Sequence, residues 1–125
     1  MLPSMIYGEF NRKGELVFDI GLIAADRSQY PVRAILDTGF NQWLLINNKD
    51  AENLEWLRQW DTQKAQTAGG TVMLNIYEGN ILIDGKEWMV PVLGSSRVKD
   101  ILLGVRWLRY KRLVADFATG VLTLG

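Results

Sequence analysis

Hydrophobic and polar residues alternate with a period of two along most of the chain, which is the pattern of half-buried β-strands. Short stretches rich in Gly, Asn, Asp and Ser separate these segments and favour turns. Strands are predicted over residues 5–10, 15–23, 30–36, 43–46, 72–83 (as one strand or two), 86–93, 100–103, 113–117 and 121–124. Many short strands with turns about 8–12 residues apart predict a small barrel or sandwich.

Two segments depart from this period. Between residues 50 and 60 the apolar residues recur at helical spacings, with Asp50 available as an N-cap, so we predict a short helix there. A second short helix is predicted over residues 105–110. The segment Thr67-Ala68-Gly69-Gly70-Thr71 predicts a flexible joint, and Asp84-Gly85 predicts a tight hairpin turn.

Composition narrows the class of protein. The chain has 125 residues, 48% of them hydrophobic and 22% charged, and no linker or repeat interrupts it, so a single domain over residues 1–125 is predicted. The formal net charge is zero, which argues against nucleic acid as a partner and mildly favours self-association. No apolar run approaches the length of a membrane span and no secretory signal opens the chain, so we expect no membrane partner and a cytoplasmic protein.

The chain contains no Cys and no His. Disulfide scaffolds, Cys nucleophiles, Ser-His-Asp triads and most catalytic zinc sites are therefore excluded. Any catalysis must depend on carboxylates, Lys, Tyr, Ser or Thr, or on a hard cation held by oxygen ligands.

One carboxylate follows an apolar segment directly, in Ile35-Leu36-Asp37-Thr38-Gly39. A carboxylate at the end of a buried strand is predicted to lie in a low dielectric, which disfavours its charged form. The Thr38 hydroxyl can hold the loop, and Gly39 permits close approach and can offer its N–H to the carboxylate. The same tripeptide is also common in ordinary turns, so a turn remains the alternative from these residues alone.

A second motif lies about 65 residues downstream, where Asp100-Ile101-Leu102-Leu103-Gly104 precedes Val105-Arg106-Trp107-Leu108. An apolar strand leading into Asp-Thr-Gly, then a glycine-rich hairpin, then this apolar-apolar-Gly motif resembles the order found in the retropepsin-like aspartic proteases. The resemblance covers roughly residues 15–124.

The resemblance implies an all-β fold, a small closed barrel of the acid-protease type with one or two short helices and one catalytic Asp per chain. Asp37 would be the catalytic acid, Thr38 would interlock with its copy across a two-fold axis, and Gly39 would line the carboxylate. A flap over about residues 67–76 would close on the substrate. The implied substrate-binding residues are Phe40, Gly69, Gly70, Thr71, Val72, Leu103 and Gly104. No metal or organic cofactor is implied.

Hydrolysis by this chemistry requires two carboxylates in different protonation states. The sequence holds no second Asp-Thr-Gly, since Asp84 occupies a turn position and Asp116 is expected to be structural. A two-fold homodimer supplies the second Asp37. The leading hypothesis is therefore an aspartic endopeptidase, active as a homodimer on a peptide or protein substrate.

Two alternatives remain at this stage. The residue after the tripeptide is usually Ala, Ser or Thr in the resembling family, and here it is Phe40, which cannot donate a hydrogen bond to a carboxylate and could narrow the cleft or turn outward. A catalytically weak or inactive module for dimerisation or peptide binding is the first alternative. A glycan-cleaving enzyme with two carboxylates in one chain is the second.

Overall fold

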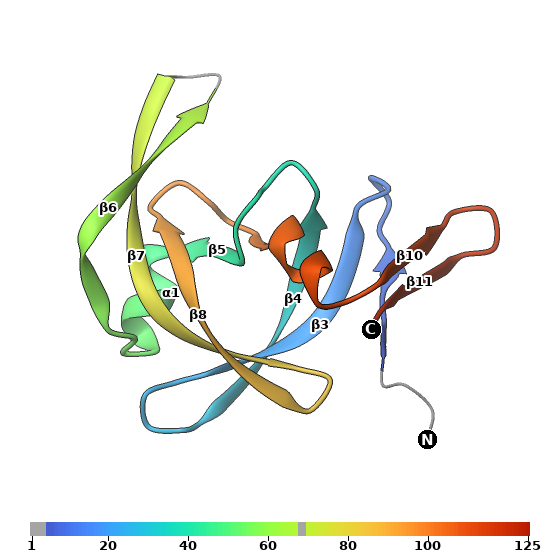
Figure 1. Ribbon diagram of the computed structural model, residues 1–125, viewed down its shortest axis with the longest axis horizontal. Helices are drawn as coiled ribbons and strands as arrows, with labels where there is room; N and C mark the ends of the chain where they lie inside the picture. Colours follow the sequence, from blue (N-terminus) through green and yellow to red (C-terminus); the bar gives the residue numbers. More distant parts are fainter. Residues whose placement is uncertain (1–4, 68–69) are drawn as a thin grey trace.

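A closed barrel of six strands forms the centre of the computed structural model, which describes residues 5–67 and 70–125 (Figure 1). Around the barrel the order is β3 (Leu16–Ile23), β4 (Gln29–Asp37), β9 (Ile101–Gly104), β5 (Leu44–Asn47), β8 (Lys86–Ser95) and β7 (Gly70–Ile83). The barrel closes because β7 pairs antiparallel with β8 on one side and with β3 on the other. The prediction of a small all-β barrel is confirmed.

The period of two in the sequence becomes an inner and an outer face of the barrel. In β3 the side chains of Phe18, Ile20 and Leu22 are buried, whereas Asp19 between them is exposed. The same alternation in the neighbouring strands fills the barrel with aliphatic side chains. Trp107 closes one end of this core, is fully buried and donates its indole N–H to the backbone carbonyl of Trp43 at 2.8 Å.

A three-stranded sheet lies beside the barrel, where the two ends of the described chain meet (Figure 1). It consists of β1 (Ile6–Tyr7), β11 (Val121–Leu124) and β10 (Leu113–Asp116), with β11 in the middle. The neighbouring β2 (Glu9–Phe10) pairs with β3 of the barrel. The rings of Phe10 and Phe117 stack with their centroids 4.1 Å apart, so an apolar contact ties this sheet to the barrel.

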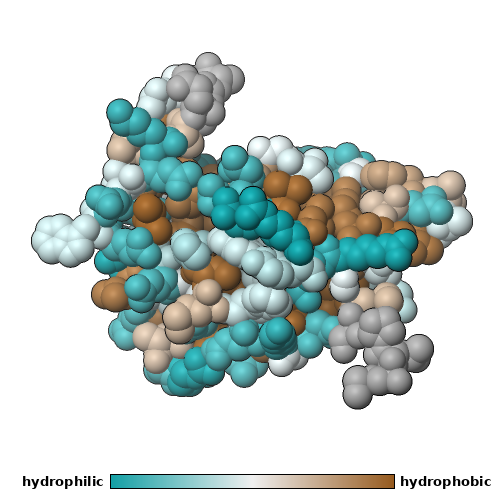
Figure 2. All heavy atoms as spheres, viewed as in Figure 1, coloured by the Kyte–Doolittle hydropathy of each residue, from teal (hydrophilic) through white to brown (hydrophobic). Residues whose placement is uncertain are grey.

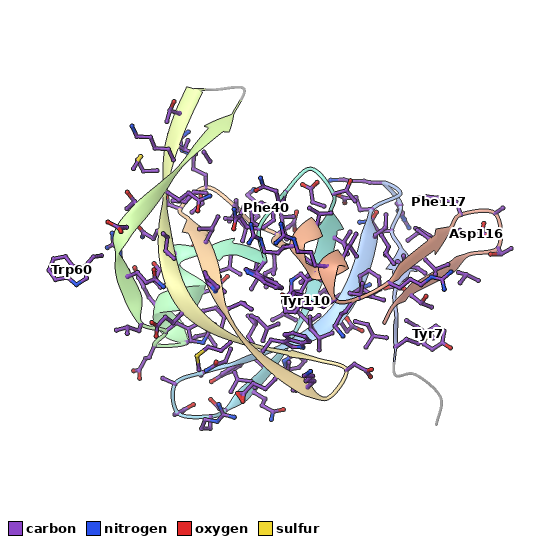
Figure 3. All side chains as sticks on the ribbon, viewed as in Figure 1. Tyr7, Phe40, Trp60, Tyr110, Asp116 and Phe117 are labelled. Atoms are coloured by element: carbon purple, nitrogen blue, oxygen red, sulfur yellow. The ribbon has the colours of Figure 1, made fainter. Side chains whose placement is uncertain are left out.

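The predicted helix over residues 50–60 is wrong in its bounds. The helix α1 spans Asn48–Asn53, its N-cap is Asn47 rather than Asp50, and the chain leaves it through Glu55 in a left-handed conformation with φ 57°. Trp56 then turns inward and donates its indole N–H to Ile23 at 2.8 Å. Trp60 lies in the strand β6 (Arg58–Thr67), which the helical pattern had obscured, and its side chain points away from the barrel, fully exposed (Figure 3).

The strands β6 and β7 form a long hairpin that projects from the barrel (Figure 1). β7 is a single strand of 14 residues, and Thr67 pairs with Gly70 at the far end of the hairpin. The predicted joint over residues 67–71 therefore coincides with the turn of this hairpin, although Ala68 and Gly69 lie outside the described residues. The remaining predicted strands appear with their ends shifted by at most two residues, the strand over residues 121–124 has the predicted bounds, and the segment 5–10 divides into β1 and β2.

The turn at Asp84-Gly85 and the short helix near residue 105 both follow the prediction. Asp84 and Gly85 have φ values of 54° and 75°, the left-handed pair that a two-residue hairpin requires. The helix η1 (Val105–Arg109) is a 3₁₀ helix. Among the described residues, no helix combines the length and the apolar character needed to cross a membrane.

Asn47 connects α1 to the loop between β8 and β9. Its substitution is expected to separate the contribution of the helix N-cap from that of the hydrogen bond to the loop. Its side-chain oxygen accepts the Lys49 N–H at 2.9 Å, and its amide donates to the Val98 carbonyl at 2.9 Å. Asn47→Ala loses both bonds and should lower the free energy of unfolding by about 1–2 kcal/mol. Asn47→Ser keeps an acceptor for the N-cap and places no second acceptor against the Val98 carbonyl, so it should lose less. Urea unfolding of both variants tests this, and equal losses would contradict the capping role.

Candidate active site

Strand β9 brings together two segments that lie far apart in the sequence. It runs parallel to β4, so that Leu36 faces Leu103 and Asp37 faces Gly104, and antiparallel to β5, so that Leu44 also faces Leu103. The chain from Asp37 to Leu44 therefore crosses over the end of β9 as a loop. We call residues 37–43 the acidic loop.

Backbone hydrogen bonds from the end of β9 hold the acidic loop. The Val105 N–H donates to the Phe40 carbonyl at 2.8 Å, and the Gly104 N–H donates to the Trp43 carbonyl at 3.0 Å. Within the loop the Phe40 N–H donates to the Asp37 carbonyl at 3.1 Å, which closes a turn. The loop conformation is thus set by residues that follow it by more than sixty positions.

Gly104 is a glycine because the acidic loop passes directly over it. A Cβ at this position would overlap the backbone carbonyl of Gln42, which cannot move without displacing the loop. The backbone of Gly104 is extended, with φ −86° and ψ 166°, so the requirement is steric rather than conformational.

The Asp37 carboxylate stands at the mouth of the barrel. Its Oδ1 accepts the Gly39 N–H at 2.8 Å, the contact expected from the sequence, and this is its one hydrogen bond among residues 5–67 and 70–125. Asp37 and Thr38 are both exposed in the single chain. The expected low-dielectric setting of the carboxylate is therefore absent from one chain, because Asp37 lies one residue beyond the buried Leu36, where the strand leaves the core.

A cleft of about 560 Å³ opens between the acidic loop, the β6–β7 hairpin and the loop from Ser95 to Val98. Its lining consists of Gly39, Phe40, Asn41, Gln42, Leu45, Gln63, Lys64, Ala65, Val72, Leu74, Leu93, Ser95, Arg97 and Val98. Figure 2 shows hydrophobic residues at the foot of the hairpin with hydrophilic residues around them. This mixture of an apolar lining and a polar border suits an extended chain with alternating side chains.

The structure brings most of the predicted residues to this region. Asp37, Thr38, Gly39 and Phe40 share the acidic loop, and Phe40, half-buried, lines the cleft between the hairpin and η1 (Figure 3). Val72 lines the opposite wall.

The other predicted substrate contacts differ in position. Leu103 is fully buried and Gly104 lies beneath the acidic loop, so both support the loop from behind and neither lines the cleft. Gly70 and Thr71 lie at the far end of the hairpin and do not line the cleft of the single chain. Gly69 lies outside the described residues.

Several lining residues were missed by the sequence analysis. The apolar ones are Leu45, Ala65, Leu74, Leu93 and Val98, and the polar ones are Asn41, Gln42, Gln63, Lys64, Ser95 and Arg97. The strand β6 is polar except for Trp60 and Ala65, so its sequence offers no alternation to identify it, and the spacing of the tryptophans favoured a helix. The segment 95–98 carries no signal in its residue types, because its role follows from where β8 ends.

Asp116 is not part of this site. It lies in the terminal hairpin, where its Oδ1 accepts the N–H groups of Ala118 at 3.0 Å and Thr119 at 3.4 Å. Hydrogen bonding from Thr119 is the largest of the causes that lower the pKa of its carboxyl below the ordinary value. Asp116 therefore stabilises a turn, as expected. Among the described residues, no group of three or more acidic side chains could hold a metal ion.

The lowered pKa of Asp116 predicts a pH dependence of stability. Because the folded chain binds this proton less readily than the unfolded chain, the stabilisation is present above the unfolded pKa and is lost as the pH falls through the lowered folded pKa. Asp116→Asn should therefore lower the Tm at neutral pH, and the two Tm curves should converge below about pH 4. Thermal unfolding of both proteins between pH 7 and pH 2 checks this, and curves that stay parallel would contradict it.

Comparisons with known proteins show similarity at the level of fold. None of the known protein families matches the chain, and neither does any curated protein sequence. Among solved structures, a retropepsin-like aspartic protease from Rickettsia conorii is similar over 99% of this chain and 96% of that one, with 19% identity and a TM-score of 0.72.

Two viral enzymes are similar over shorter lengths. The simian foamy virus protease shares 21% identity over 76% of this chain and 99% of its own, with a TM-score of 0.50. The EIAV protease in complex with the inhibitor HBY-793 shares 16% identity over 84% of this chain and 98% of its own, with a TM-score of 0.59.

Proposed function

We propose that this chain, which has the retropepsin-like fold, is an aspartic endopeptidase that acts as a homodimer. The observation that carries the proposal is the exposed Asp37 carboxylate, which accepts at 2.8 Å the N–H of Gly39, a residue that lines the cleft of about 560 Å³. A carboxylate fixed by its own loop and open to solvent is placed to act on water.

The chemistry needs a second carboxylate, and the lining of the cleft described in one chain contains no Asp or Glu. In a two-fold dimer the two Asp37 side chains would face each other at about 3 Å and share one proton, because both cannot be charged at that distance. The ionised carboxylate takes a proton from water, whose oxygen attacks the scissile carbonyl, while the protonated one polarises that carbonyl. The tetrahedral intermediate then collapses as a proton passes to the leaving amine.

The cleft supports an extended peptide as the substrate class. The hairpin offers Val72 and Leu74, the acidic loop offers Phe40 and β8 offers Leu93, so alternate side chains of a bound strand would meet apolar surface. In a dimer the two hairpins would cover the two halves of one continuous groove. Gly70 and Thr71, at the far end of the hairpin, would then approach the substrate from above.

The alternatives are less well supported. Phe40 lines the cleft and leaves Asp37 exposed, so its bulk does not block the carboxylate, and a non-catalytic module is not favoured. A glycan-cleaving enzyme would need a second acid beside Asp37 within one chain, and the described lining of the cleft contains no Asp or Glu.

Cleavage of an unstructured protein tests the proposal. The purified chain should cut a denatured protein substrate between mildly acidic and neutral pH, and a peptide that carries a hydroxyl in place of the scissile carbonyl should inhibit it, because such a group mimics the tetrahedral intermediate. Size-exclusion chromatography with light scattering should show a dimer at the concentrations that are active. A strictly monomeric but active protein would contradict the two-chain mechanism.

A further inference from the structure

The described lining of the cleft carries an excess of positive charge. Its lining includes the two cations Lys64 and Arg97, and within its described part it contains no Asp or Glu. The whole chain is neutral, with 14 basic and 14 acidic residues, so the excess is local. A groove with walls of low polarity concentrates such a field and raises the local concentration of groups of opposite charge.

Arg97 is the better placed of the two cations. It lies on the loop between β8 and β9, is exposed, and takes part in none of the ion pairs formed by the described residues, which involve Arg27 and Arg33. Its backbone N–H is fixed by the Ser95 hydroxyl at 3.2 Å, and the Asn47 amide holds the next carbonyl at 2.9 Å. The guanidinium therefore extends from an ordered loop with its donors available for an incoming carboxylate.

Lys64 contributes to the attraction of acidic groups mainly through the electrostatic field of its charge. It lies opposite Met73 in the β6–β7 hairpin, and this pair occupies the face turned away from Val72 and Leu74. The Lys64 side chain thus leaves the strand on the outer face, at the border of the cleft. At physiological salt a charge still acts over about 8 Å, so Lys64 adds to the attraction without needing direct contact.

We propose that the cleft selects peptides that carry an acidic residue within a few positions of a large apolar residue at the cleavage point. The apolar side chain would pack among Phe40, Val72 and Leu93, and the substrate carboxylate would pair with Arg97. This inference rests on the proposed function and names the substrate class of the same site.

Matched peptides test the selection. Internally quenched octapeptides with Leu-Phe at the centre would carry Glu, Gln or Lys two or three positions to either side, and kcat/KM would be measured with the full chain at 20 mM and 0.5 M NaCl. We expect the best Glu peptide to exceed its Gln counterpart by about fivefold at low salt, and its Lys counterpart by more, with both ratios falling toward one at high salt.

Variants assign the effect to the cleft. Arg97→Gln should bring the ratio of kcat/KM between the Glu and Gln peptides close to one. Arg97→Glu should make kcat/KM higher for the Lys peptide than for the Glu peptide. Lys64→Gln should lower the ratio between the Glu and Gln peptides by less than Arg97→Gln does. Lys13→Glu makes the same change of charge as Arg97→Glu in the exposed turn between β2 and β3, outside the cleft lining, and should keep the wild-type ratios.

The outcomes separate this inference from the proposed function. Cleavage of all peptides at similar kcat/KM, whatever their charge, would overturn the selection and leave the endopeptidase in place. Absence of cleavage would count against the endopeptidase, and binding of hydroxyl-containing, non-cleavable forms of the same peptides, followed by fluorescence anisotropy, would then decide the selection. Tighter binding of the Glu form would support it and equal affinities would overturn it.

Discussion

Replacing Asp37 by asparagine is expected to reduce peptide cleavage by about a thousandfold or more while the chain remains folded and dimeric. The amide has nearly the same shape as the carboxylate and its oxygen can still accept the Gly39 N–H, which is bonded at 2.8 Å in the native chain. It can neither remove a proton from water nor share one with its copy, so the general acid–base contribution is lost. The measurement is kcat/KM on a quenched peptide, accompanied by the Tm and the molar mass in solution.

A matched control is available at Asp84. Asp84→Asn makes the same chemical change in an exposed turn, at a φ of 54° that asparagine tolerates well. This variant should leave kcat/KM and Tm close to the native values. Activity in Asp37→Asn close to that of the control would show that the acidic loop is not the catalytic centre. Loss of the dimer in Asp37→Asn would instead assign the residue a role in assembly.

Gly104→Ala is expected to be the most damaging single-methyl change in the region of the site. The new Cβ would overlap the backbone carbonyl of Gln42, and the loop can yield only by breaking the bond from the Gly104 N–H to Trp43. We expect a loss of about 3 kcal/mol in the free energy of unfolding and a decrease of about 10 °C in Tm. Because the displaced segment contains Asp37, kcat/KM should fall further than the Tm alone would explain.

Gly120→Ala separates steric overlap from backbone conformation. Gly120 has φ 73° and no atom within 4 Å of the position that a Cβ would take, so its substitution costs conformational energy alone, about 1 kcal/mol. Gly104 has an unstrained backbone, so the cost of Gly104→Ala in the free energy of unfolding comes from steric overlap alone. Denaturant unfolding of the two variants compares these effects, and a smaller loss for Gly104→Ala than for Gly120→Ala would show that the acidic loop moves freely.

The sequence predicted the barrel well because buried and exposed residues alternate over much of its strands, as Phe18, Asp19 and Ile20 illustrate. It predicted the contact between Asp37 and Gly39 because two residues within one turn can be judged from local geometry. These are short-range features, and physical rules for strands and turns apply to them directly.

The errors arose where distant contacts decide the local structure. Trp56 and Trp60 have a helical spacing, yet Trp56 is drawn inward by its bond to the Ile23 carbonyl and Trp60 lies in a strand, fully exposed. Arg97 was overlooked because its place in the cleft depends on the pairing of β8 and on the bond from Asn47 to Val98. Neither contact is visible in the residue types alone.

The position of β9 between β4 and β5 has a consequence for the timing of folding. The bonds that hold the acidic loop come from Gly104 and Val105, so a chain emerging from the ribosome has Asp37 exposed long before the residues that shape its surroundings exist. Closing such a long stretch of chain is slow compared with forming a local hairpin. The acidic loop, which holds the proposed catalytic Asp37, therefore takes its final conformation only when translation of the barrel is almost complete.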